Sequence, residues 1–203
     1  MYKLFKTILN AVFPRKMRYK MEPLLRGFYA VFKKGKNHLC VICTFKTSSF
    51  ELLPNADLLC PKCGSLSRDR RLWKTISENY LQANTKILDF SPSRCLYRKW
   101  KKELGIEYVA SDLSDNIIAT VAYDITQIPK QDNQCDLIIC YHSLEHVIDD
   151  MKAMTELYRV LKPKGTLLVQ TPFKDGDIYE DYNITSEPER LSCFGQEDHV
   201  RVY

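Results

Sequence analysis

The sequence predicts an α/β chain in which a doubly wound, mainly parallel sheet follows a small cysteine-rich module. From residue 86 onward, short apolar runs alternate with segments of helical periodicity, a pattern typical of parallel sheets that helices cover on both faces. Before that point, sixteen residues separate two Cys-x-x-Cys pairs. The chain has 203 residues, 45% hydrophobic and 27% charged, and so is long enough to bury a core.

Basic residues concentrate at the N-terminus. The first 39 residues hold ten lysines and arginines and one acid, whereas the whole chain has a net charge of +5. Apolar side chains recur at helical spacing over residues 4–13, which predicts a basic amphipathic helix. Anionic lipid or a nucleic-acid backbone would attract this helix, unless its apolar stripe packs on its own protein. We expect Pro14 to end it and Pro23 to interrupt a second helical segment that runs toward Phe32.

Four of the eight cysteines, Cys40, Cys43, Cys60 and Cys63, have the spacing of a tetrahedral zinc site. Two residues between thiolates let one tight turn present both sulfurs to the same ion, and Gly64 supplies a free backbone after the second turn. Four cysteine ligands leave no position for a reacting water, so the metal is expected to stabilise the fold. Disulfides or a redox pair are the alternatives, and the expected intracellular location and the doubled motif disfavour them.

The other cysteines lack this spacing: Cys95, Cys135, Cys140 and Cys193. Cys135 and Cys140 flank an apolar run and are most simply small core residues. Residues 65–81 predict a helix that leaves the zinc module. We expect the arginines of this helix to lie on a face that is exposed to solvent, although they could instead bind a phosphate group.

Five short strands are expected in the α/β region, over residues 87–90, 108–110, 117–123, 135–141 and 166–170. One predicted helix runs from the turn at residues 91–93 to about residue 104, before Gly105. Asp149 and Asp150 open another, which reaches residue 161, and their charges suit the positive end of a helix dipole.

The acids at the strand ends indicate what the sheet binds. In a doubly wound sheet, ligands lie outside the carboxyl ends of the strands, where the strand order reverses. Asp89 beside a glycine-free turn suits a cationic ligand better than a pyrophosphate. Asp112 lies about 20 residues beyond that turn, where an acid accepts hydrogen bonds from ribose hydroxyls. S-adenosylmethionine, a nucleoside with a sulfonium and an ammonium group, meets both conditions.

Several other classes of protein are excluded or disfavoured. The seven glycines lack the spacing of a dinucleotide-binding or P-loop motif, which disfavours a nicotinamide oxidoreductase. No stretch approaches 18 consecutive apolar residues, and the N-terminus lacks a secretory cleavage pattern. We therefore expect a cytoplasmic protein, peripheral to the membrane if the basic segment binds lipid.

Three segments resemble those of a known family: CDLIICYHSLEHV (residues 135–147), YRVLKPKG (158–165) and FGQEDHVRVY (194–203). The match is most specific in these segments, and residues 86–171 as a whole resemble a class I S-adenosylmethionine-dependent methyltransferase of the broad type-11 group. Residues 40–73 resemble the zinc ribbon of one bacterial branch. The resemblance implies a Rossmann-like methyltransferase fold, S-adenosylmethionine and structural zinc as cofactors, and transfer of a methyl group to an unidentified acceptor.

The resemblance also implies which residues contact the cofactor. The methionine portion would face Asp89, Phe90, Ser91, Pro92 and Ser93. The ribose would contact Asp112 with Leu113, the adenine Asp124 with Ile125, and His142 and Ser143 would lie along the cofactor.

Methyl transfer from a sulfonium is an in-line displacement of an activated group, so the protein mainly supplies alignment. Glu145 and His146 are candidate catalytic residues that accept a proton from the nucleophile, and His199 is a weaker candidate. The alternative is that Glu145 and His146 cap and brace the following helix. Residues 174–190 are expected to form a substrate-facing loop or an acidic surface loop.

We divide the sequence into a basic arm (1–37), a zinc ribbon with its linking helix (38–82) and a methyltransferase domain (83–203). The domain departs from the family pattern in its glycine-free first turn and in stopping before the last helix and two strands. We expect either a second copy to cover the open sheet edge or reduced activity. The other class of function is a non-catalytic zinc-ribbon scaffold that binds a nucleic acid, membrane or protein partner.

Overall fold

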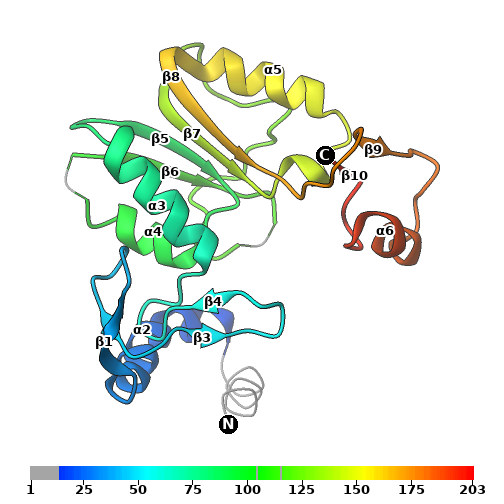
Figure 1. Ribbon diagram of the computed structural model, residues 1–203. Coiled ribbons are helices and arrows are strands. Elements are labelled where there is room, and N and C mark those ends of the chain that lie inside the picture. Colours follow the sequence, from blue (N-terminus) through cyan, green and yellow to red (C-terminus); the bar gives the residue numbers. More distant parts are fainter. Residues whose placement is uncertain (1–13, 104, 115) are drawn as a thin grey trace. The chain divides into compact units, whose positions relative to one another are not determined.

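The computed structural model describes residues 14–103, 105–114 and 116–203 (Figure 1). The described residues form two compact units. The first holds those up to Leu81 together with Ser93–Glu103, and the second holds Gln82–Pro92 together with those from Gly105 onward. The amphipathic helix predicted over residues 4–13 lies outside the described residues.

Helix α2 (Arg15–Val31) opens the first unit and continues through Pro23, so the predicted interruption is wrong. A proline inside a helix removes the N–H that would bond the carbonyl four residues earlier, here that of Tyr19. Arg98 replaces this donor, because its Nη2 lies 2.8 Å from the Tyr19 carbonyl oxygen and 3.0 Å from Glu22 Oε2. A contact from a distant part of the sequence thus compensates the proline.

Two small antiparallel hairpins carry the cysteine pairs. Strand β1 (Lys34–Leu39) pairs with β2 (Lys46–Thr47), and β3 (Glu51–Leu52) pairs with β4 (Leu58–Leu59). The first cysteine pair follows β1 directly and the second follows β4 directly. Each pair therefore starts at the end of a hydrogen-bonded strand, which restrains its backbone.

The helix predicted over residues 65–81 is confirmed as α3 (Ser67–Asn79). The Asp69 carboxylate accepts a hydrogen bond from the Leu66 amide, 2.8 Å away, at its first turn. In the same unit, α4 (Arg94–Trp100) places Trp100 against Trp73 of α3, with ring centroids 4.9 Å apart. Packing of these two rings joins α3 to α4.

The second unit contains a parallel sheet, which confirms the predicted fold class (Figure 1). Its strands are β5 (Lys86–Phe90), β6 (Glu107–Ser111), β7 (Cys135–Tyr141) and β8 (Leu161–Gln170). Their order across the sheet is β6-β5-β7-β8, so the order reverses beside β5. Phe90 at the end of β5 pairs with Ser111 of β6 and Cys140 of β7, which aligns the carboxyl ends of the three strands.

The sheet has four strands, so the prediction of a fifth over residues 117–123 is wrong. This segment makes only one isolated bridge to the sheet, from Val121 to Ser111. The amides of Thr120 and Val121 both donate to the Ala110 carbonyl, and Ala119 closes a turn onto Asn116. Because two successive amides share the one carbonyl of Ala110 in β6, no regular ladder extends along that strand, although the run is apolar.

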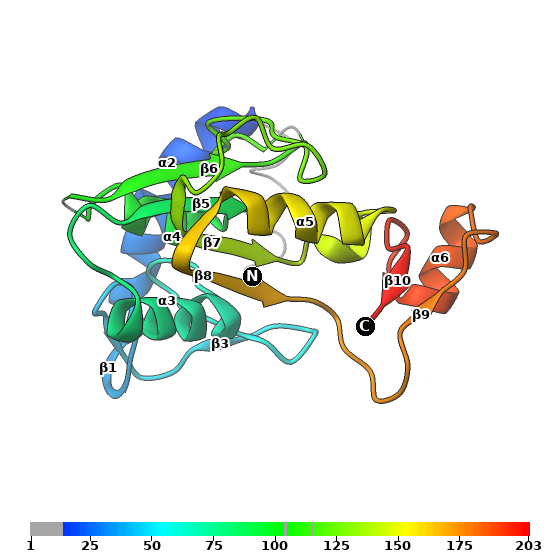
Figure 2. The same cartoon turned by 90° about the horizontal axis from the view of Figure 1, so that it is seen from above.

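Helix α5 (Asp150–Val160) packs on the sheet and completes its core (Figure 2). Asp149 caps it by accepting a hydrogen bond from the Lys152 amide, 2.9 Å away. The buried face of α5 and the strands share one cluster, which includes Leu88, Ile138, Cys140, Ala153, Leu157 and Val160. Cys135 and Cys140 are confirmed as core residues, and burial raises the pKa of the Cys140 thiol to about 12.

Residues 171–203, here called the C-terminal residues, lie beyond the carboxyl ends of β7 and β8 in both views (Figures 1 and 2). They form β9 (Tyr179–Glu180), α6 (Glu187–Phe194) and β10 (Arg201–Val202), which pairs antiparallel with β9. The Val200 amide donates to the carbonyl of Glu145 in the 3₁₀ turn η1 (Leu144–His146), 2.8 Å away. Among the helices that the structure describes, none is long and apolar enough to cross a membrane.

Candidate metal and cofactor sites

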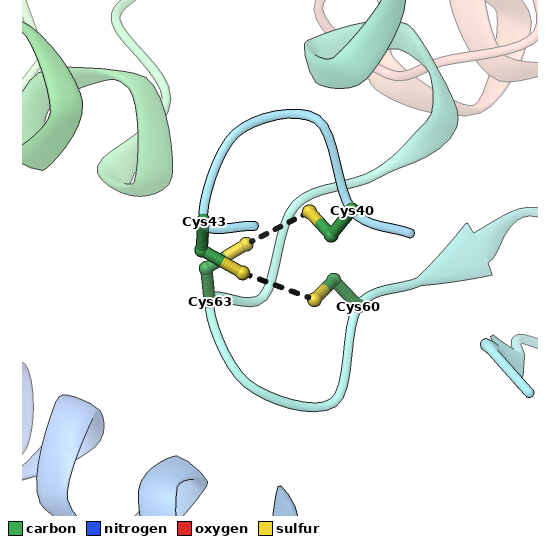
Figure 3. Close-up of side chains that lie close together, drawn as sticks. All are labelled: Cys40, Cys43, Cys60 and Cys63. Carbon is green, nitrogen blue, oxygen red and sulfur yellow. Dashed lines mark hydrogen bonds between the residues drawn. The ribbon is translucent and has the colours of Figure 1, made fainter. Parts of the chain in front are cut away.

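The four predicted zinc ligands come together in the first unit (Figure 3). The Sγ atoms of Cys40 and Cys63 lie 3.7 Å apart and those of Cys43 and Cys60 lie 3.8 Å apart, and all four thiols are free. Four sulfurs bound tetrahedrally to zinc at about 2.3 Å stand about 3.8 Å from one another. The arrangement of the sulfurs therefore fits a tetrahedral zinc ion.

The backbone folds each cysteine pair in the same way. In both, the residue after the second cysteine donates its amide to the carbonyl of the first: Thr44 to Cys40 at 2.8 Å and Gly64 to Cys60 at 3.0 Å. Both donors have a left-handed backbone, with φ of 55° for Thr44 and 75° for Gly64, which explains the glycine predicted at this turn. A hydrogen bond from the Cys43 thiol lowers the pKa of Cys40.

Ser65 and Arg70 surround the cysteine cluster. The hydroxyl of Ser65 is fully buried and lies 3.2 Å from Cys63 Sγ and 3.5 Å from Cys40 Sγ. Arg70 donates to the Ser65 carbonyl at 2.7 Å and to the Leu58 carbonyl at 3.0 Å. The prediction of a solvated arginine face on α3 is wrong for Arg70, because its guanidinium joins the second cysteine turn to strand β4.

In the second unit, the loops that follow β5 and β7 meet at the reversal of strand order, where the sequence predicts the crevice. The Ser143 hydroxyl donates to Ser91 Oγ, 3.3 Å away. Ser91 and His142 both follow strand ends with a left-handed backbone, at φ of 57° and 52°. Such strain at non-glycine residues is typical of functional sites. His142 Nε2 is also buried without a hydrogen-bond partner among the described residues, as expected where a ligand supplies one.

The other residues predicted around the methionine portion occupy different environments. Asp89 is 2% exposed and accepts a hydrogen bond from the Tyr108 hydroxyl, 2.6 Å away, a partner that sequence reasoning missed. Phe90 belongs to the hydrophobic core. Pro92 is buried, whereas Ser93 caps α4 by accepting from the Leu96 amide at 3.4 Å. Register explains the missed partner, because Tyr108 approaches Asp89 only once β6 pairs with β5.

The two acids predicted near the nucleoside stand in local turns. Asp112 Oδ1 accepts from the Ser114 amide at 2.8 Å, and Oδ2 accepts from Asn116 Nδ2 at 2.8 Å. Asp124 accepts from the amide and the hydroxyl of Thr126, both at 2.8 Å, and these hydrogen bonds lower its pKa. Their neighbours differ, since Leu113 is 67% exposed and Ile125 is 6% exposed.

The predicted catalytic pair lies close to His199. Glu145 is fully buried in η1, and the rings of His146 and His199 have centroids 4.8 Å apart. Asp149 performs the capping of α5 that the alternative interpretation gave to Glu145 and His146. Sequence reasoning gave His199 as a weaker candidate, and 53 residues separate it from His146. Only the return of the C-terminal residues past β7 brings the two together.

A buried ion pair holds the C-terminal residues to α5. Arg201 is fully buried, forms an ion pair with Asp150 at the start of α5 and donates to the Ile148 carbonyl at 2.7 Å. The Tyr203 hydroxyl donates to Asp150 Oδ2 at 2.7 Å. Although burial opposes the charge, hydrogen bonds from Arg201 and Tyr203 lower the pKa of Asp150.

Acid is therefore expected to weaken this attachment. An unfolded aspartate titrates near pH 3.9, at about its reference pKa. The lowered pKa of Asp150 contributes stability that is fully present above this value and is lost as the pH falls through the folded pKa. Urea midpoints measured from pH 6 to pH 3 should fall less steeply for Asp150→Asn than for the wild type. Equal slopes would contradict this role for Asp150.

Comparisons with known proteins bear on the part of the chain that forms the parallel sheet. Residues 88–169 match the family model described as a methyltransferase domain. This methyltransferase-like domain includes β5, both loops at the strand-order reversal, α5 and nearly all of β8.

Two of the curated relatives of this chain are bacterial methyltransferases. Over 118 residues the chain is 33% identical to the ubiquinone/menaquinone biosynthesis C-methyltransferase of Neisseria meningitidis, covering 49% of this chain and 48% of that protein. It is 27% identical to the demethylmenaquinone methyltransferase of Mycolicibacterium vanbaalenii, covering 68% of this chain and 67% of that one. The chain thus spans half to two thirds of the length of these relatives.

A solved structure supports the fold. A protein of Galdieria sulphuraria assigned as a sarcosine dimethylglycine methyltransferase matches with a TM-score of 0.50 and 25% identity, covering 69% of this chain and 57% of that one. The second unit therefore has the Rossmann-like methyltransferase fold.

Proposed function

We propose that this chain is an S-adenosylmethionine-dependent methyltransferase whose acceptor is still to be identified. One observation supports this function above all: the loops after β5 and β7 meet at the strand-order reversal, within the segment that matches a methyltransferase domain. A ligand at this place in a doubly wound sheet contacts both loops. When bound, S-adenosylmethionine supplies an activated methyl group, and the protein aligns it with the acceptor.

The residues at the strand ends are proposed to hold the cofactor. The segment from Asp89 to Ser93 would contact its methionine portion, and His142 with Ser143 would lie along it. Asp112 and Leu113 would contact the ribose. Asp112 Oδ2 accepts one described hydrogen bond, from Asn116, and a carboxylate oxygen has capacity for a second.

Asp124 with Ile125 is proposed to contact the adenine. Asp89 at the end of β5 and Asp112 just after β6, together with Asp124, would attract a ligand that carries a sulfonium and an ammonium. Glu145 and His146 follow β7 and remain our candidates for accepting a proton from the acceptor. The His146 side chain is about one third exposed, so an acceptor can approach it.

We also propose that the four clustered cysteines bind structural zinc, because their sulfur separations match those of a tetrahedral zinc site. An anionic partner for the N-terminal arm remains a proposal. It is supported by the charge of the first 39 residues and by an exposed apolar row on and beside α2: Leu24, Phe28, Val31 and Phe32. A second copy along the outer edge of β8, where no described strand pairs, is likewise a proposal.

Calorimetric titration of the full, zinc-loaded chain with S-adenosylmethionine and with S-adenosylhomocysteine tests the proposed function. We expect both to bind. Asp112→Ala should weaken binding about 5- to 150-fold, the equivalent of about 1 to 3 kcal/mol, through loss of a charge-assisted hydrogen bond.

Asp175→Ala is the matched control, because it removes an exposed acid of the C-terminal residues. Its affinity should equal that of the wild type. Absence of binding to a folded sample would overturn the proposed function, and an unchanged affinity for Asp112→Ala would overturn the ribose assignment.

A further inference from the structure

Glu145 has a buried carboxylate oxygen without a hydrogen-bond partner. The side chain is fully buried, and its Oε1 lies 3.1 Å from His142 Nδ1. Because a carboxylate only accepts hydrogen bonds, His142 donates here and orients the group. The second oxygen, Oε2, has no partner among the described residues. An unpartnered carboxylate oxygen is costly to bury, so a native site normally supplies a proton donor or a cation to it.

Two histidines beside Glu145 have the tautomer that suits a metal ligand. His146 Nδ1 lies 3.3 Å from both the carbonyl oxygen and Oδ2 of Asp198. His199, which is 2% exposed, has its Nδ1 3.2 Å from the carbonyl oxygen of Phe194. These oxygens only accept, so each Nδ1 carries the proton and each Nε2 has a free lone pair. Hydrogen bonding of one ring nitrogen to an oxygen is how proteins orient metal-ligating histidines.

The three side chains converge. One carboxylate oxygen and one ring nitrogen from each histidine all lie within 4.8 Å of one another. Ligand atoms at about 2.1 Å from one ion in tetrahedral geometry stand about 3.4 Å apart, so these side chains would have to move together by up to about 1.4 Å to complete the site. Two histidines and one carboxylate are a ligand set of catalytic zinc and of non-haem iron, and they leave coordination positions open.

We propose that Glu145, His146 and His199 bind one divalent transition-metal cation, in a site separate from the four cysteines. His142 is its positioning residue, because it holds Glu145 Oε1 and leaves Oε2 toward the cation. Glu145 and His199 are buried whereas His146 is about one third exposed. The open coordination positions therefore face the solvent-accessible side of the cluster.

The position of the cation also indicates which kind of compound accepts the methyl group. This inference about the acceptor rests on the proposed function, whereas the cation site itself does not. Glu145 and His146 follow β7 within one turn of Ser143, which contacts the loop after β5. A cation there would bind an acceptor through an oxygen and lower the pKa of that oxygen, and it would then activate the acceptor in place of direct proton transfer to Glu145 or His146. The acceptor class this favours is a hydroxylated compound that can chelate a metal.

Mn²⁺ binding to the full, zinc-loaded chain tests the site. Zinc already fills the thiolate site, and Mn²⁺ prefers oxygen and nitrogen ligands, so it reports on the second site. Titration without S-adenosylmethionine, followed by the electron paramagnetic resonance signal of free Mn²⁺, should show one bound ion per chain. Equilibrium dialysis against Zn²⁺ should raise the zinc content from one to two per chain.

The variants His146→Ala and Glu145→Gln should each weaken this second site at least tenfold. His146 is partly exposed, so its variant should keep the wild-type melting temperature even if the buried Glu145→Gln does not. His38→Ala in β1 and Glu197→Gln next to Asp198 are controls and should bind like the wild type.

Two results would overturn the site: no second ion, Mn²⁺ or Zn²⁺, on a folded chain, or a second ion that His146→Ala leaves unaffected. The assay contains no S-adenosylmethionine, so its result does not depend on the proposed function. If the chain binds the ion but neither S-adenosylmethionine nor S-adenosylhomocysteine, the cation site is supported and the proposed methyltransferase function is overturned.

Discussion

Cys60→Ser is expected to abolish zinc binding and to unfold the cysteine module of the first unit. Cys60 is buried and faces Cys43 across 3.8 Å between their sulfurs, so its loss opens the tetrahedron. Metal binding by small structural zinc modules contributes on the order of 10 kcal/mol to folding, more than the two short hairpins supply alone. Metal analysis and thermal denaturation of the purified variant would measure both losses.

The matched control is Cys193→Ser. Cys193 is exposed and lies in the second unit, so this variant should keep the zinc content and the melting temperature of the wild type. A strong chelator should reproduce the Cys60→Ser phenotype in the wild-type chain. Full stability of a metal-free chain would show that the cysteines do not form a structural zinc site.

Arg201→Ala is expected to destabilise the second unit by about 3 to 5 kcal/mol, because it leaves buried charges without their partner. Arg201 is fully buried, and it forms ion pairs with Asp150 and, at 3.2 Å, with Glu180. Its removal also takes the donor from the Ile148 carbonyl. The midpoint of urea unfolding would measure the loss, and faster proteolysis after β8 would locate it.

Arg68→Ala removes an exposed arginine and should change the unfolding free energy by less than about 0.5 kcal/mol. The double variant Asp150→Asn with Arg201→Met should recover part of the stability, since it removes the unpaired charge and refills the volume. If Arg201→Ala unfolds at the wild-type midpoint, the C-terminal residues do not depend on this ion pair.

Features that depend on neighbours in sequence could be predicted from the sequence. Cys-x-x-Cys spacing defines a turn by itself, and all four predicted ligands cluster as expected. The apolar run at residues 135–141 is a strand with those bounds, and Asp149 caps the helix that follows. Hydrophobic periodicity and local hydrogen bonding decide such features within one turn or one strand.

Contacts between distant residues decided what sequence patterns could not. Whether the run at 117–123 joins the sheet depends on where its amides find acceptors, and they bond Ala110 and nearby turns. Whether Pro23 breaks a helix depends on Arg98, which bonds the carbonyl that the proline leaves without a donor.

The candidate sites likewise combine features that local sequence determines with features that depend on contacts between distant residues. The sequence by itself determined the fold class, the four cysteines that cluster and the residues that follow β5, β6 and β7, because residue type and spacing express them. Only the tertiary structure decided that Ser91 meets Ser143 and that His199 lies beside Glu145. Strand order and the return of the chain past β7 create these contacts. The free energy of packing that selects them is a property of the whole unit, and no single segment determines it.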